Sequence, residues 1–153
     1  MQSLDPGTSE ISPEADDKWY SYALVRVVPR VERGEFLNVG AVVFSRERDF
    51  LDSRVEVDEA RLRGLAPTLD LQTVERHLTT FRAIAEGRAE GGPIAVLPKP
   101  ERFHWLVAPR STMIQTSPVH VGRTANIEKA LEDLLNEFVR LPQAAGAAGA
   151  EGA

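Results

Sequence analysis

The sequence predicts an α+β fold, an antiparallel sheet of three to four strands with helices packed on one face. Two patterns support this prediction. Residues 19–57 form three apolar, β-branched segments separated by short polar turns, which is typical of an antiparallel meander. Residues 58–140 instead carry apolar side chains at helical spacing behind residues that cap helices.

Three strands are predicted in the first half of the chain. Trp19 to Val28 is aromatic and β-branched, with no helical period. Residues 36–45 are apolar on both faces, which predicts a central strand. Residues 50–57 alternate apolar and polar side chains, which predicts an edge strand with one wet face. Thr112 to Thr116 is predicted as a further short strand.

The helices are predicted from caps and spacing. Asp58 is expected to cap a short helix, and Asp70 a longer one that stops at Gly87. Glu101 to Val107 favours a short helix or a turn. The last helix is expected over Asn126 to Arg140, with its apolar residues on one side.

One folded domain is expected over residues 19–141. Residues 1–18 are acidic and polar and predict a disordered tail, and residues 142–153, rich in Ala and Gly, predict a flexible one. The N-terminus lacks the apolar segment of a signal peptide, and the longest apolar run is too short to cross a bilayer. We therefore expect a cytoplasmic protein without a membrane anchor.

Composition narrows the chemistry. The absence of cysteine excludes disulfides and thiolate sites. His77, His104 and His120 follow no metal-ligand spacing, so neither a metal nor another cofactor is expected. A net charge of −5 argues against nucleic-acid binding, which relies on Lys and Arg. The oligomeric state stays open, because the strand pattern permits sheet extension without requiring it.

A polar stretch over residues 103–122 holds one group of candidate ligand-binding residues. Arg110, Ser111 and Thr112 bring together a guanidinium, two hydroxyls and backbone N–H groups, the parts of a small anion pocket. Gln115 adds an amide. The same hydroxyl residues after a proline are also ordinary turn formers, so both interpretations stand.

His120 is the candidate acid or base of that stretch. It precedes Gly122 and follows a Ser-Pro pair, which predicts a loop, where reactive groups are commonly displayed. With Ser111 it would form a nucleophile–base pair. The chain has no G-x-S-x-G motif and no orienting acid close by, so structural or ligand hydrogen bonding is favoured over catalysis.

Arg26, Glu35 and Asn38 form a second group of candidates. Arg26 lies in an apolar strand, where a buried guanidinium needs partners, and Glu35 is the nearest carboxylate across the predicted hairpin. Arg26 is therefore in a structural ion pair, or turned outward at a sheet edge, or it holds an anionic ligand. Asn38 and Gly40 interrupt an apolar strand, which indicates a bulge, a close backbone approach or a ligand against exposed backbone.

Two segments together resemble a known family. One is residues 25–40, with VRVVP followed by ERGEFLNVG, and the other is residues 102–120, with RFHWLVAPRST followed by QTSPVH. They resemble the bacterial family named domain of unknown function 3037, over most of residues 20–139. The resemblance implies no activity. Members are often encoded beside HipA-like kinases, so it implies such a kinase as a partner.

Two functional hypotheses follow. The first is a small protein-interaction or regulatory module, with a HipA-like kinase or another protein as partner, because no catalytic motif is complete. The alternative is a hydrolase or transferase acting on an anionic small molecule or phosphoester. In that case Arg26 and Arg110 would hold the anion. Ser111 and Gln115 would position it, and His120 would act as acid or base.

Overall fold

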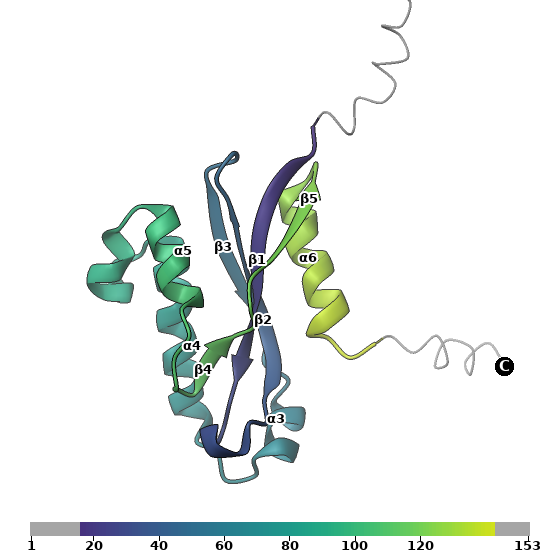
Figure 1. The fold of residues 1–153 in the computed structure, drawn as a ribbon. Helices are drawn as coiled ribbons and strands as arrows, with labels where there is room; N and C mark the ends of the chain where they lie inside the picture. Colours follow the sequence, from purple (N-terminus) through teal and green to yellow (C-terminus); the bar gives the residue numbers. More distant parts are fainter. Residues whose placement is uncertain (1–15, 143–153) are drawn as a thin grey trace, which may run out of the picture.

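The computed structural model describes residues 16–142 (Figure 1). The tails predicted for residues 1–18 and 142–153 lie outside the described residues, apart from residues 16–18 and 142. The elements, in chain order, are β1 (Lys18–Val27), η1 (Val31–Arg33), β2 (Leu37–Ser45), β3 (Phe50–Val55), α3 (Glu59–Leu65), α4 (Leu71–Glu86), η2 (Ala89–Val96), α5 (Lys99–Val107), β4 (Ile114–Thr116), β5 (His120–Thr124) and α6 (Ile127–Phe138).

The sheet is antiparallel, with the order β3-β2-β1-β4, and β5 also pairs with β1. β4 pairs with the C-terminal part of β1 and β5 with its N-terminal part, so the two short strands share one edge of the sheet. The α+β class, the antiparallel sheet, the central position of β2 and the edge position of β3 are confirmed. Among residues 16–142 the sheet has five strands, one more than the upper number expected.

The additional strand exists because pairing with β1 is interrupted after β4 and then resumes. The Ser117 N–H donates to Leu24 O at 2.9 Å, and the Leu24 N–H donates to Ser117 Oγ at 2.8 Å. These bonds hold Ser117, which lies between β4 and β5, against β1. Beyond Pro118 the chain pairs with β1 again, as β5. His120 therefore begins a strand, and its predicted place in a loop is wrong.

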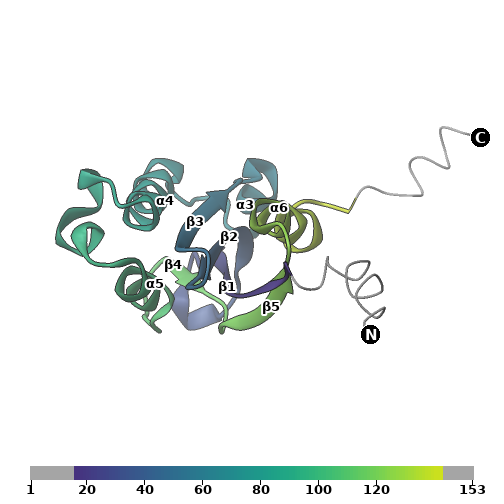
Figure 2. The same cartoon turned by 90° about the horizontal axis from the view of Figure 1, so that it is seen from above.

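Helices cover both faces of the sheet, which corrects the prediction that they pack on one face. Seen from above in Figure 2, α4 and α5 lie on one side of the sheet and α6 on the other. Ala23, Val25 and Val27 of β1 join the core beneath α4 and α5, whereas Leu24 packs with α6. The physical reason is that β1 and β2 carry apolar side chains on both faces, and each face needs a cover.

The helix ends follow their capping residues. Asp58, Asp70 and Asn126 each accept a hydrogen bond from a backbone N–H of the following turn. Gly87 closes α4 with a φ of 75°, a left-handed conformation that favours glycine. The segment predicted as a helix or a turn is α5, which begins at Lys99.

A β-bulge in β2 changes the register between β1 and β2. Val25 lies opposite Gly40, but the next residue of β1, Arg26, lies opposite Asn38, so Val39 is the additional residue. A Cβ on Gly40 would lie 2.3 Å from Arg54 O, which only glycine avoids. The bulge buries Val39 and places Asn38 beside Arg26.

Candidate functional site

The predicted site residues lie in separate places. Arg110 and Thr112 line a groove beside α4 and α5, next to the exposed Ser111. Arg26, Asn38 and Gln115 form a row across three strands on the opposite face of the sheet. Glu35 lies in the connection between β1 and β2, and His120 lies in the outer strand β5.

The groove between α4, α5 and the segment leading into β4 has a volume of about 660 Å³. α4 contributes side chains at positions i, i+3, i+4 and i+7, which share one face of a helix. The residues lining the groove are His77, Thr80, Phe81, Ile84, Trp105, Arg110, Thr112, Met113 and Ile114.

The floor of this groove is rigid and apolar. Phe81, Ile84 and Ile114 line it, and all three also belong to the main core, where they are almost fully buried. Well-packed core side chains occupy single rotamers, so the floor is formed before any ligand arrives. This is the arrangement expected of a preformed binding surface.

Trp105 and Arg110 form one wall of the groove. The guanidinium carbon of Arg110 lies 4.2 Å from the centroid of the Trp105 ring, and its Nη2 donates to Trp105 O. Partial burial lowers the pKa of Arg110, because desolvation disfavours its charged form, yet an arginine stays protonated at neutral pH. Trp105 keeps 39% of its surface exposed, so its ring remains available for contact.

Among the described residues, the groove lining contains basic side chains and no acidic ones. His77 and Arg110 are the titratable residues of its lining, and both are bases. Within residues 16–142, no carboxylate lies close enough to Arg110 to form an ion pair, whereas Arg30 and Arg33 each pair with one carboxylate and Arg140 with two. The groove therefore offers apolar surface together with an uncompensated positive charge.

The hydroxyl of Thr112 shapes the turn before β4. Its Oγ1 donates to Ile114 O at 2.9 Å, and its carbonyl accepts from Gln115 Nε2 at 2.8 Å. These contacts match the turn-forming interpretation of this stretch. Gln115 itself sits in β4 directly opposite Arg26.

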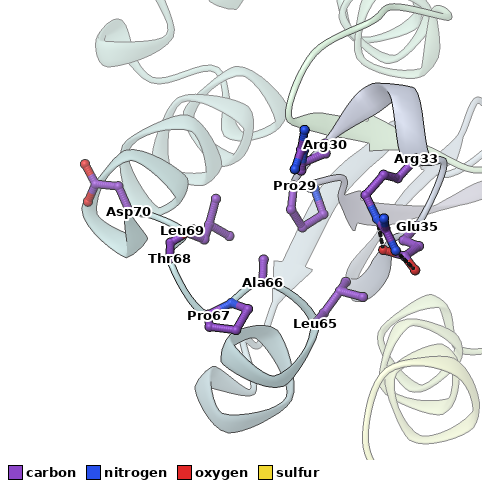
Figure 3. A pocket seen from close by; sticks show the side chains of 10 residues that line it. All are labelled: Pro29, Arg30, Arg33, Glu35, Leu65, Ala66, Pro67, Thr68, Leu69 and Asp70. Atoms are coloured by element: carbon purple, nitrogen blue, oxygen red, sulfur yellow. Dashed lines mark hydrogen bonds and ion pairs between the residues drawn. The ribbon is translucent and has the colours of Figure 1, made fainter.

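Glu35 lines a second hollow, of about 370 Å³, between the β1–β2 connection and the loop that joins α3 to α4 (Figure 3). Its carboxylate accepts two hydrogen bonds from Arg33, at 2.8 and 3.0 Å, and this pairing lowers the pKa of Glu35. The predicted ion pair between Arg26 and Glu35 is therefore wrong. Arg30 pairs in turn with Glu32, so the charges at this hollow are matched locally.

His120 and Arg110 do not share a concavity. His120 lies opposite Tyr22, with ring centroids 5.4 Å apart, and Tyr22 packs against the cluster under α6. Arg110 lines the groove on the α4 and α5 side of the sheet. Within residues 16–142 there is also no group of three or more His, Asp or Glu that would hold a metal ion.

Sequence reasoning missed His77 and Trp105 as part of the groove. Both are exposed rather than packed in the core. The signal was present in α4, where His77 and Thr80 lie on the same helix face as the buried Phe81 and Ile84. The position of Trp105 depends on how α5 packs, which spacing does not reveal.

Arg102 fixes the two helices that frame the groove. It is 7% exposed, and its guanidinium donates to Leu97 O at 2.9 Å, Ile84 O at 2.9 Å and Ala85 O at 3.0 Å. Two of these acceptors are carbonyls in the last turn of α4, where Ile84 O also accepts from the Gly87 N–H at 3.2 Å. Arg102 therefore ties α5 to the C-terminal end of α4.

No helix within the described part of the chain is long and apolar enough to span a membrane. Searches among curated proteins and among solved structures found no match. The family described as "Protein of unknown function (DUF3037)" matches residues 22–139, which include the framework of the groove and all of the sheet except residues 18–21 of β1. The match confirms the family resemblance. The chain therefore belongs to the DUF3037 family of proteins of unknown function.

Proposed function

We propose that this protein is an interaction module that binds an apolar segment carrying an acidic residue in the groove between α4 and α5. The observation that carries the proposal is the exposed Trp105 ring with the Arg110 guanidinium stacked on it, beside a floor of buried Phe81 and Ile84. Tryptophan and arginine are the residue types that most often dominate binding energy at protein interfaces.

The rigid floor supports a binding role. Phe81 and Ile84 are held by the core, and Arg102 fixes α5 against α4. A preformed surface loses little conformational entropy when a partner docks, so more of the contact energy appears as affinity. The partner's apolar side chain would insert between Trp105 and this floor.

The charge of Arg110 indicates that the partner segment carries an acidic residue. Arg110 has a planar fork of N–H donors, of which one bonds to Trp105 O. An aspartate or glutamate of the partner would accept from the remaining donors and meet no competing acid in the groove lining. An acidic segment with an apolar anchor satisfies both requirements.

We propose a HipA-like kinase from the same host as the partner that presents this segment. The support is the partner that the family resemblance implies, together with a groove whose size and chemistry suit a protein segment. The purified kinase can therefore be titrated directly into this protein.

Isothermal titration calorimetry of the purified kinase into the intact protein tests this proposal. We expect Trp105→Ala to weaken binding by more than about tenfold, since losing an interface tryptophan commonly costs more than about 1.4 kcal/mol. Trp19→Ala is the matched control, because Trp19 is 57% exposed on β1 and lies outside the groove lining. Absence of binding by the parent protein, or equal loss with both variants, would count against the proposal.

A further inference from the structure

A row of polar side chains crosses three neighbouring strands on the sheet face opposite the groove. Arg26 of β1 lies directly opposite Asn38 of β2 on one side and Gln115 of β4 on the other. Residues directly opposite in antiparallel strands project to the same face. Arg26 shares this face with Leu24, which packs against α6.

The bulge at Val39 is what completes the row. Because Val39 has no partner residue in β1, Asn38 lies opposite Arg26. The Asn38 Oδ1 accepts a hydrogen bond from Arg26 Nε at 3.4 Å. The Asn38 Nδ2 donates to Phe138 O at 3.2 Å, at the end of α6. Bulges often redirect a side chain next to a functional site, and this one orients the amide that holds the guanidinium.

The guanidinium of Arg26 is held in place but not neutralised. Its central carbon lies over the Phe36 ring, 4.0 Å from the ring centroid, a cation–π contact. Among residues 16–142, its hydrogen bond to Asn38 is its one polar side-chain contact, and no carboxylate is close enough to form an ion pair. Partial burial lowers the pKa of Arg26.

The surroundings of Arg26 suit a single negative charge. The neighbouring amides of Asn38 and Gln115 are neutral, so the row offers one cation. One N–H of Gln115 Nε2 bonds to Thr112 O, and the amide carries a second donor. A planar carboxylate matches the planar fork of an arginine better than a dianionic phosphate matches one isolated charge.

We infer that the row of Asn38, Arg26 and Gln115 is a carboxylate-recognition site that receives an acidic side chain of a partner protein. The terminal nitrogens of Arg26 bind the carboxylate side-on, and Gln115 donates to it from the neighbouring strand. Phe36 is 43% exposed beside the guanidinium, so it offers apolar contact to the methylene groups of the incoming side chain.

This site is independent of the groove. The groove is lined by Ile114, whereas the row contains Gln115, and consecutive strand residues project to opposite faces. A partner at the row would therefore leave the groove open. The inference goes beyond the proposed function, because it gives the protein a second binding face with its own chemistry.

Nuclear magnetic resonance of the side-chain amides of Asn38 and Gln115 tests the site in the intact protein. Sodium acetate is the minimal probe, titrated against sodium chloride at equal ionic strength. The second probe is the capped tripeptide acetyl-Ala-Glu-Ala-amide, compared with its glutamine counterpart. We expect both amide resonances to shift saturably with acetate and with the glutamate peptide, and to stay in place with chloride and with the glutamine peptide.

Substitutions complete the experiment. Arg26→Met should abolish the shifts, and Arg26→Lys, which keeps the charge without the fork, should weaken them. Arg123→Met is the matched control, because Arg123 also lies over an aromatic ring, Trp19, at 5.3 Å, but on another part of the sheet. Trp105→Ala should leave the shifts unchanged, which separates this result from any failure of the groove.

Three outcomes would overturn the existence of the site. They are the absence of a saturable shift with acetate, persistence of the shift in a folded Arg26→Met protein, and loss of the shift in Arg123→Met. Binding of acetate without binding of the glutamate peptide would overturn the assignment to an acidic side chain. Dispersion of the backbone amide resonances shows in each case whether the variant is folded.

Discussion

Ile114 and Gln115 are consecutive residues of β4 that serve opposite faces of the sheet. Ile114 lies opposite Val27 and lines the groove, and Gln115 lies opposite Arg26 in the polar row. One short strand therefore supports both surfaces. Because β4 pairs with β1, in which Val25 and Val27 are fully buried, the two surfaces rest on the core of the sheet.

Arg110→Ala and His120→Ala are expected to have little effect on stability. Arg110 is only partly buried and contacts Trp105, and His120 is exposed with its ring near Tyr22. Each substitution should cost less than about 1 kcal/mol, or a shift of a few degrees in the melting temperature. Thermal unfolding of the parent and both variants measures this. A much larger loss with Arg110→Ala would assign it a structural role.

Gly40→Ala is expected to destabilise the fold. The new Cβ would lie 2.3 Å from Arg54 O, and backbone atoms of a paired strand have little room to move. We expect a loss of about 1–3 kcal/mol in the free energy of unfolding, measured by urea denaturation. Gly64→Ala is the control, because nothing lies within 4 Å of its Cβ position in α3, and it should gain about 0.5–1 kcal/mol. Equal stability of the two variants would contradict the close approach.

Arg102→Met should be strongly destabilising although it preserves much of the side-chain volume. Removing the guanidinium leaves the carbonyls of Leu97, Ile84 and Ala85 without this donor in a buried place. We expect a loss of about 2–4 kcal/mol. The exposed Arg82 of α4 is the control, and Arg82→Met should change stability by less than about 0.5 kcal/mol. A melting temperature of Arg102→Met equal to that of the control would contradict this role.

Arg140 makes stability depend on acid pH. It hydrogen-bonds to Glu56 after β3 and to Glu132 of α6, and these bonds lower the pKa of both carboxyls. Because the folded-state pKa values lie below the unfolded value of about 4.3, the contribution is present above that pH and is lost as pH falls through the folded values.

Urea midpoints at pH 7 and pH 3 measure this dependence. The parent protein should lose more stability between the two pH values than Arg140→Gln, in which Glu56 loses its arginine and Glu132 keeps only Arg54. Arg82→Gln, which removes an exposed arginine of α4 away from these acids, should behave as the parent. A pH dependence unchanged by Arg140→Gln would refute the linkage.

Local patterns predict most of the elements. The two-sided apolar character of residues 36–45 predicts the central strand, and Asp58, Asp70 and Asn126 predict the helix starts that the structure confirms. These features depend on residues close together in the chain. The same two-sided pattern also implied covers on both faces, and that consequence was missed.

The candidate surfaces depend on pairings that local patterns do not contain. Arg26 meets Gln115 only because β4 joins β1, and it meets Asn38 only because of the bulge at Val39. The expected partner, Glu35, lies nearer in sequence but binds Arg33 across a glycine turn. His120 enters a strand only because Ser117 anchors the chain against Leu24.

The most direct test of the proposed interaction is fluorine nuclear magnetic resonance of the protein labelled with 5-fluorotryptophan. The chain has two tryptophans, Trp19 and Trp105, so each resonance is assigned by one substitution. On addition of the unlabelled HipA-like kinase, the Trp105 resonance should shift or broaden to saturation while the Trp19 resonance stays in place. A kinase titration that moves neither resonance, or only that of Trp19, would contradict binding in the groove.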